Sequence, residues 1–501
     1  MFKKIKENVS GAFGSVAVFF FLCVFPMAIM NGYHDITAMK QITFCLITVV
    51  FTFLCLFTYF LTCSSERLTT LPKLSATDIA MLLFLFVAVF SCISSPWVLT
   101  ALSGRAARRM GFVTVLATVM AYFLVSRFYK LRRREFIFLG LITIFMCVFS
   151  IIQFSGFDPL GFLSTVAVKK RPNFIGFSGN VNMFAALLTL FVPLFFTLFC
   201  FEKKVLPSIA WFLFALVGMC GMFATNSDGG ILGLVVAFAV LLLVCFKSRI
   251  LLAKCMFVFS TFFLSMFIFY MIRRIFEEKA RISAPLYKIM LDPKVFVPGF
   301  VFFTALAVMI LAFKPGEAFL LKLRKIYIIA VIAVIALTTL LFIYFTLIDK
   351  ESEIGEASRY FRFNDKWGSK RGYAWKKAMR LYAQAPLARK LIGYGEDNVA
   401  MAFFGTYGRR TFSDIGLIFD NVHNYFLQYL ITLGAWGMIT YTLTLIFALR
   451  TAFKDSSYIK TAIAVAICAY IAQSTVNITQ PISTPMLYVF LGLAQSRSQV
   501  N

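Results

Sequence analysis

The sequence predicts an all-α polytopic membrane protein with about fourteen transmembrane helices. Hydrophobic residues make up 60% of the 501 residues, charged residues only 14%, and the mean hydropathy is +0.85. Soluble domains contain far more charged residues. Most apolar runs have the roughly 17 to 25 residues that a helix needs to cross a bilayer. We therefore expect membrane lipids, and no nucleic acid, around this chain.

Polar interruptions divide the apolar runs into individual spans. We expect spans near residues 11–32, 42–62, 79–95, 111–127, 136–155, 181–201, 208–225, 230–246, 255–272, 295–313, 326–348, 425–449, 460–475 and 484–496. This pattern predicts three parts: helices 1–11 over residues 1–348, a large extracytoplasmic lid loop over 349–424, and helices 12–14 with a cytoplasmic C-terminus over 425–501.

The distribution of lysine and arginine predicts the orientation. Basic residues in short loops are retained in the cytoplasm. With the N-terminus inside, the inner loops carry 23 of the 49 basic residues, and half of the remainder lie in segment 349–424. We therefore expect a multi-pass plasma-membrane protein with both termini cytoplasmic.

The lid loop is expected to contain one helix that lies on the membrane surface. Between Lys370 and Ala385, Trp375, Met379 and Tyr382 recur at i, i+4 and i+7, while basic residues occupy the other faces. This pattern is typical of an interfacial helix. Its alternative is an amphipathic cap that only seals the bundle.

His423 is one of only two histidines and stands at the start of the twelfth expected span. The positive end of a helix favours a neutral imidazole, which can accept a proton. Asn424 is adjacent, and Gln428 one turn later could reach the same pocket. We therefore expect His423 to act as a general base, although an interfacial histidine can also merely anchor a helix. His34 has fewer polar neighbours and is expected to be structural.

Arginine and lysine side chains cluster near several outer span ends. A guanidinium group can clamp a phosphate at two points, so a group of arginines around one histidine suits a pyrophosphate leaving group. Attraction to anionic lipid headgroups is the alternative for any single cation. Arg371 on the expected lid helix is best placed to reach the site, and the further candidates are Arg105, Lys169, Arg171, Arg274, Arg409 and Arg410.

Three stretches of sequence resemble the superfamily of bacterial O-antigen ligases and O-antigen (Wzy-type) polymerases. The first is His423-Asn424-x-Phe426-Leu427-Gln428 with the later Gly434 and Gly437. The second runs from Arg371-x-x-x-Trp375 through Pro386 to Gly393-Tyr394-Gly395. The third is Arg171 followed by Gly179, Asn182 and Phe184-Ala185.

The resemblance implies a metal-independent, lid-covered glycosyltransferase without cofactors. Such an enzyme takes glycan from an undecaprenyl-pyrophosphate-linked oligosaccharide on the outer side of the bacterial plasma membrane and transfers it to a glycan or lipid acceptor. It implies that His423 deprotonates the acceptor hydroxyl and that Arg371 and partners stabilise the diphosphate. Asn182, Trp375, Asn424 and Gln428 are then expected to contact substrate.

One position departs from the family pattern. Many relatives carry Ser-Arg-Gly after the mid-chain turn, whereas this chain has Ser227-Asp228-Gly229. If the usual arginine holds phosphate, another cation must replace it here. Lys169, Arg171 and Arg274 are the expected replacements.

Two other classes of protein are compatible with parts of this pattern. A lipid-linked oligosaccharide flippase or exporter also needs a cationic cavity, but it should place charges within spans and show repeated halves. A metal-dependent glycosyltransferase needs acidic ligands in outer loops. Pairs such as His34-Asp35, Glu277-Glu278 and Glu396-Asp397 lack a clear ligand spacing, and the eleven cysteines lie in or beside apolar runs.

Overall fold

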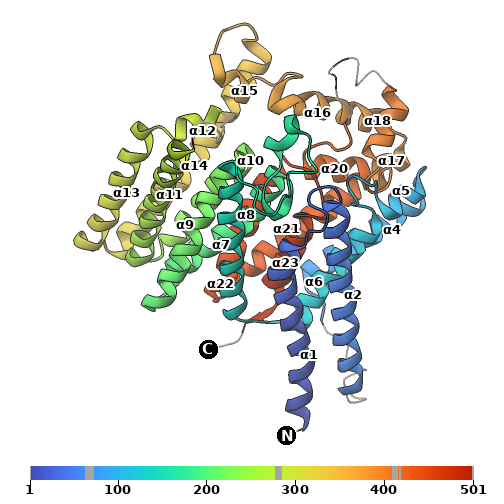
Figure 1. The fold of residues 1–501 in the computed structure, drawn as a ribbon, viewed down its shortest axis with the longest axis horizontal. Coiled ribbons are helices and arrows are strands. Elements are labelled where there is room, and N and C mark those ends of the chain that lie inside the picture. The colour runs from blue at the N-terminus through green and yellow to red at the C-terminus, as the bar shows by residue number, and fades with distance from the viewer. Residues whose placement is uncertain are drawn as a thin grey trace.

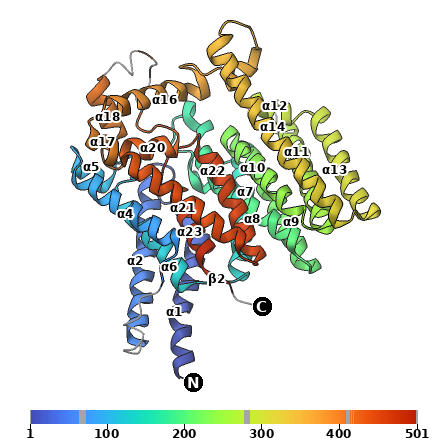
Figure 2. The same ribbon diagram turned by 180° about the vertical axis from the view of Figure 1, so that it is seen from behind.

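The computed structural model describes residues 2–62, 73–276, 285–408, 414, 416 and 419–498. It is a helical bundle capped at one end by short helices (Figures 1 and 2). The longer helices are α1 (Phe2–Phe19), α2 (Ile36–Thr62), α4 (Ala76–Ile93), α6 (Phe112–Phe128), α7 (Arg134–Phe154), α8 (Val181–Phe201), α9 (Val205–Thr225), α10 (Asp228–Cys245), α11 (Arg249–Ile275), α13 (Pro293–Phe313), α14 (Glu317–Ile343), α16 (Trp367–Gln384), α21 (Gly434–Lys454), α22 (Tyr458–Ser474) and α23 (Thr484–Gln495).

Shorter elements connect these helices. Short α-helices are α5 (Val98–Ser103), α12 (Pro285–Met290), α15 (Ser358–Phe361), α17 (Leu387–Ile392), α18 (Val399–Tyr407) and α20 (Tyr425–Thr432). Short segments of 3-10 or π-helix are η1 (Phe20–Val24), η2 (Phe25–Met27), η3 (Val168–Asn173), η4 (Gly176–Ser178), η5 (Tyr344–Ile348) and η6 (Gly355–Ala357). Two short strands, β1 (Lys130–Leu131) and β2 (Arg497–Ser498), pair in parallel.

The expected all-α polytopic architecture is confirmed. In the described part of the chain, 11 helices are long and apolar enough to cross a membrane. Three shorter apolar helices, α6, α22 and α23, occupy the positions of three further expected spans. The sharp turn expected after the seventh span is also present, because Asn226 adopts a left-handed conformation (φ 50°) that ends α9 two residues before α10 begins.

Burial differs greatly between helices. Helix α8 lies at the centre of the bundle. Of its most apolar 18-residue stretch, 94% is buried, and the helix packs against α9, α10 and α22. Helix α14 is peripheral, and none of its most apolar stretch is buried. Its Tyr327 hydroxyl donates a hydrogen bond to the Ala239 carbonyl of α10 (2.9 Å). An apolar helix with so little protein contact is stable where hydrocarbon surrounds it.

The expected twelfth span is not one helix. It is divided into α20 and α21 at Leu433–Gly434, where Gly434 has φ +69°. Only glycine adopts this conformation without strain, and a Cβ atom at Gly434 would overlap the Leu391 carbonyl group. The prediction of a continuous helix over 425–449 was therefore wrong: α20 lies at the capped end and α21 continues through the bundle (Figure 2).

The expected lid helix is present as α16, but it buries a different face. Its buried side chains are Tyr373, Ala374, Ala378 and Leu381, whereas Met379 is exposed. Trp375 and Tyr382 of the expected apolar face are partly buried against the same cluster, so the most buried face lies one residue earlier than the expected one. Small alanines allow α16 to pack closely against α18 and α20, in a core cluster that includes Val399, Phe403 and Ile431.

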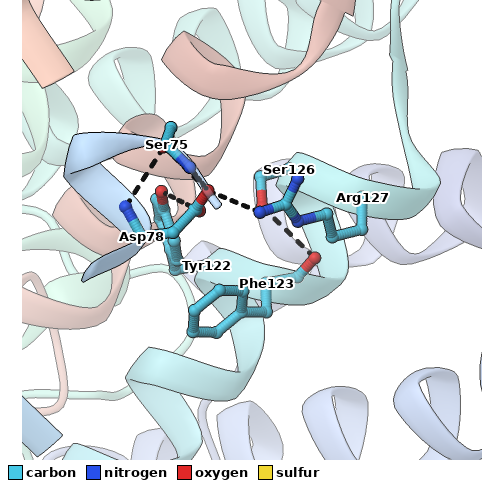
Figure 3. Close-up of polar contacts among 6 residues, drawn as sticks. All are labelled: Ser75, Asp78, Tyr122, Phe123, Ser126 and Arg127. Atoms are coloured by element: carbon cyan, nitrogen blue, oxygen red, sulfur yellow. Dashed lines mark hydrogen bonds and ion pairs between the residues drawn. The ribbon is translucent and has the colours of Figure 1, made fainter. Parts of the chain in front are cut away.

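At the opposite end of the bundle, near the chain termini, a polar cluster joins α4 to α6 (Figure 3). The Asp78 carboxylate accepts hydrogen bonds from the Ser75 amide and hydroxyl (both 2.7 Å), the Tyr122 hydroxyl (2.8 Å) and the Arg127 guanidinium (2.5 Å). Ser75 also caps α4 through the Asp78 amide. Each carboxylate oxygen is therefore paired, as a buried charge requires.

Candidate active site at the lid end

His423 occupies a strained position that its neighbours hold in place. Its φ is +58°, an uncommon conformation for a residue with a Cβ atom. Its amide donates to Asn421 Oδ1 (2.9 Å), and the preceding Val422 amide donates to Gln428 Oε1 (3.1 Å). The Trp375 indole nitrogen of α16 donates to the Val422 carbonyl (3.0 Å). Strain maintained by surrounding bonds is common at functional sites.

Three residues expected to contact substrate instead form bonds within this loop. Asn424 is the N-cap of α20, and its Oδ1 accepts a hydrogen bond from the Leu427 amide (3.1 Å). Gln428 and Trp375 use their polar atoms on the backbone beside His423. The geometry therefore gives all three a positioning role.

Arg371 approaches the same place from α16. It directly follows Gly368, Ser369 and Lys370, which all have positive φ values of 55°, 60° and 74° inside the helix. Its Nε is buried and has no hydrogen-bond partner. Burial lowers the pKa of Arg371, and the charge of Asp228 opposes that effect. An unpaired guanidinium atom in a buried place is costly unless a ligand satisfies it.

The loop between α5 and α6 contributes further arginines, Arg105 and Arg108. Arg108 forms a two-point ion pair with Asp420, with Nε to Oδ2 at 2.9 Å and Nη2 to Oδ1 at 2.7 Å. The Asp397 carboxylate fixes the loop by accepting the amides of Arg105 (2.7 Å) and Met110 (3.3 Å). Arg105 Nη1 is buried without a partner. The charges of Arg105 and His423 both act on Asp420.

Burial, with the nearby arginines, favours the neutral form of His423. Burial, and then the charges of Arg371 and Arg108, lower its pKa to about 4, while Asp420 acts in the opposite direction. Burial raises the pKa of Asp420, but its bonds to Arg108 outweigh that effect and leave it low. At neutral pH the site therefore holds an uncharged imidazole beside a carboxylate and two arginines.

Asp228 also lies within this electrostatic environment. It begins α10, and the charges acting on it are those of Arg359 and Arg371. Asn182 of α8 is connected to this turn because its Oδ1 accepts a hydrogen bond from the Ser227 hydroxyl (2.7 Å). Asp228, which stands where this chain departs from the family pattern, therefore interacts electrostatically with Arg359 and Arg371.

Three expected cations are not joined to this site. Lys169, Arg171 and Arg274 are exposed. The Arg171 Nε donates to the Val166 carbonyl of its own loop (3.2 Å). None of the described hydrogen bonds or ion pairs links the three to His423 or Arg371, so their expected role as replacement cations lacks support in the geometry. Arg409, Arg410, Glu277 and Glu278 lie outside the described residues.

Sequence reasoning considered Glu396 and Asp397 only as possible metal ligands and did not predict their supporting role. Burial raises the pKa of Asp397 to about 7 and that of Glu396 to about 8, with Asp397 raising Glu396 further. Asp397 anchors the Arg105–Met110 loop. The sequence feature that could have indicated this role is that Glu396 and Asp397 directly follow the Gly393-Tyr394-Gly395 turn. Within the described ranges, no group of three His, Cys, Asp or Glu side chains could hold a metal ion.

The described geometry combines a neutral imidazole, that of His423, with two arginines, Arg371 and Arg105, that each have a buried nitrogen without a hydrogen-bond partner. Such an arrangement can receive a proton on one side and stabilise an anion on the other.

Comparison with known proteins gives one family. No curated protein matches the chain. Residues 298–442 match the family described as O-antigen ligase, and this segment contains α14, the lid helices, Arg371, His423 and the first residues of α21. The match confirms the resemblance to the O-antigen ligase and polymerase superfamily and supports O-antigen-ligase-like glycan transfer in general terms. Over residues 298–442 the chain is therefore similar to the O-antigen ligase family.

Proposed function

We propose that this protein transfers glycan from an undecaprenyl-pyrophosphate-linked donor to an acceptor hydroxyl on the outer side of the bacterial plasma membrane. The family match supports glycan transfer, and the spans make the protein multi-pass. In this proposal the end that carries α16 and His423 faces outward, segment 349–424 acts as the lid, and both termini are cytoplasmic.

One observation carries the proposal. A neutral His423 stands among Arg371 and Arg108, and buried guanidinium nitrogens of Arg371 and Arg105 have no hydrogen-bond partner. Protein carboxylates do not satisfy these nitrogens, so an anionic ligand is the group that fits them. A diphosphate next to a neutral base is the combination that glycan transfer from a polyprenyl diphosphate needs.

The reaction can be written with these groups. His423 accepts the proton of the acceptor hydroxyl while its oxygen attacks the anomeric carbon of the donor sugar. The bond from that carbon to the diphosphate oxygen breaks, and both of its electrons leave with the polyprenyl diphosphate. Arg371 and Arg105 stabilise the charge on the departing oxygens, in a poorly hydrated site where fixed cations are most effective.

Donor binding should also make His423 a stronger base. In the free protein Arg371 and Arg108 oppose protonation of the imidazole. The negative diphosphate offsets those charges and so raises the pKa of His423 from about 4 toward neutrality, where a general base is most effective. Proton abstraction is then favoured only when the donor is in place.

The apolar part of the donor fits the lipid-facing side of the bundle. Helix α14 leads from this side to segment 349–424 through η5 and α15, and most of its side chains are exposed. We propose that the prenyl chain lies in the hydrocarbon beside α14 while its diphosphate reaches Arg371.

The decisive experiment uses purified full-length protein and a defined undecaprenyl-pyrophosphate oligosaccharide. A product ladder from the donor alone would identify a polymerase, and transfer only after a second acceptor is added would identify a ligase. No transfer with any of a set of glycan and lipid acceptors would contradict the proposal. Activity lost in EDTA and restored by magnesium or manganese would contradict the metal-independent mechanism.

A further inference from the structure

We propose a second anion site, which binds a phosphate group, at the end of the bundle opposite His423. A cavity of about 530 Å³ lies there, within the size range of ligand sites. Three segments far apart in the chain form its wall: Leu131–Arg134, Asp455–Ile459 and Ser498. The pairing of β1 with β2 brings the last segment beside the first.

Arg132 is the residue that points to a ligand. It lines the cavity, and its Nε is buried without a hydrogen-bond partner. Ser498 also lines the cavity, and its hydroxyl is likewise buried without a partner. Two residues from different segments thus line one cavity and each carries an unpaired buried donor, and a group that accepts hydrogen bonds from both would satisfy them.

The neighbouring charges are already paired with one another. Arg133 forms an ion pair with Glu202 and lies over the Trp211 ring, 5.4 Å from its centroid. Arg134 pairs with Glu135 at 3.2 Å.

The one carboxylate in the cavity wall, Asp455, is also satisfied. It binds the Lys460 ammonium at 2.7 Å and accepts the Ser457 amide at 2.9 Å. The negative charges of this region are thus offset by other cations, and the charge of Arg132 remains available to an incoming anion.

Two helix N-termini add positive potential to the same cavity. Helix α7 begins at Arg134 and α22 at Tyr458, and both residues line the cavity. Neither helix has a side-chain hydrogen bond at its N-cap, so the first amides keep free donor capacity. Helix N-termini are common binding places for phosphate.

The chemistry therefore selects a phosphate monoester or diester with several acceptor oxygens. Guanidinium, hydroxyl and amide donors arranged around a cavity bind such oxygens better than a carboxylate or a halide. Its source is either a free phosphate or the headgroup of an anionic lipid in the adjacent leaflet. This inference does not depend on the proposed glycan transfer.

Binding to purified full-length protein tests the inference. Inorganic phosphate is titrated by calorimetry in detergent, and phosphatidylglycerol in mixed micelles is followed by native mass spectrometry against phosphatidylcholine. All samples carry Arg371→Ala, which weakens anion binding at the lid. We expect one saturable equivalent of one probe, weakened at least tenfold by Arg132→Gln. Arg249→Gln, which changes an exposed arginine outside the cavity wall, should alter the affinity less than twofold.

The two probes distinguish the sources. Saturation by inorganic phosphate indicates a free phosphate ligand, and selective retention of phosphatidylglycerol indicates a lipid headgroup. Absence of saturable binding of both probes, or equal binding in Arg132→Gln, overturns the inference. If Arg132→Gln does not fold, Ser498→Ala decides: a loss of about threefold supports the site, and unchanged binding overturns it.

Discussion

Two charged clusters at opposite ends of the bundle follow different rules. In the Asp78 cluster a carboxylate, two hydroxyl groups and Arg127 satisfy one another with short bonds (Figure 3). Around His423, Arg371 and Arg105 retain buried nitrogens without partners, and the histidine backbone is strained. Both clusters contain buried charge in an apolar chain, but only the cluster around His423 has buried guanidinium nitrogens without a hydrogen-bond partner.

The difference separates charges that maintain the fold from charges that await a ligand. A closed cluster gains stability from each member and loses it when one is removed. An open cluster costs stability in the free protein and recovers it when the ligand binds. Four predictions test this contrast.

The largest effect is expected from His423→Ala at the open cluster. Loss of a general base should lower glycan transfer by roughly 100- to 10,000-fold, measured as product formed per folded protein. Because alanine tolerates the left-handed conformation poorly, His423→Asn is the matched control. Both variants should be inactive, and the His423→Asn variant should keep a near-normal melting temperature. Substantial product from the His423→Asn variant would show that the backbone, rather than the imidazole, matters.

The next effect concerns the closed cluster. Asp78→Asn leaves Arg127 without its counter-charge and should lower the free energy of unfolding by about 3 kcal/mol, measured by denaturant titration in detergent. The exposed Asp35→Asn is the control and should have little effect. Activity per folded molecule should not change. A large loss of activity without destabilisation would remove the distinction between the clusters.

Arg371→Ala should have a smaller effect on transfer than loss of the base. Removal of one charge-assisted contact to the diphosphate should lower kcat/KM for the lipid donor by roughly 10- to 100-fold. Arg380→Ala tests an exposed arginine of the same helix and should be close to wild type. Donor kinetics that Arg371→Ala leaves unchanged would exclude this residue from the site.

The smallest effect is a shift in titration. The pKa of His423 should lie near 4 in the free protein, and NMR can read it because His34 is the only other histidine and can be removed by His34→Asn. Pyrophosphate or Arg371→Ala should each raise it. A pKa that stays constant in both samples would contradict the electrostatic coupling.

The same shift has a consequence for stability. The unfolded chain binds the proton more tightly than the folded protein between about pH 4 and 6.5. The contribution of His423 to stability is therefore complete above this window and falls as the pH decreases through it. Replacement of His423 should remove this part of the pH dependence.

The number and position of the spans could be predicted because apolar length is a direct property of the chain. The break at Gly434 was missed because hydropathy stays high on both sides of it, and the only signal was one glycine. The packed face of α16 was displaced because Ala374 and Ala378 are small, and their role depends on how closely α18 and α20 approach.

The site was only partly predictable for a related reason. His423 and Arg371 belong to short motifs, so sequence could select them. The pairing of Arg108 with Asp420 joins residues 312 positions apart, and no local pattern reveals it. Lys169 and Arg274 were chosen because they lie near outer span ends, and Arg171 also because it begins the third family-like stretch. Neither criterion specifies how close a residue lies to His423.

The break between α20 and α21 allows the segment after α17 to bond directly to the end of the helix that begins beside His423. The amides of Tyr394 and Gly395 donate to the carbonyls of Ile431 (3.1 Å) and Thr432 (2.8 Å) at the end of α20. Gly393 and Gly434 let these backbones meet, since a Cβ atom on either would overlap the other segment. A displacement of the segment after α17 would therefore be transmitted through these two hydrogen bonds to α20, the helix that begins beside His423.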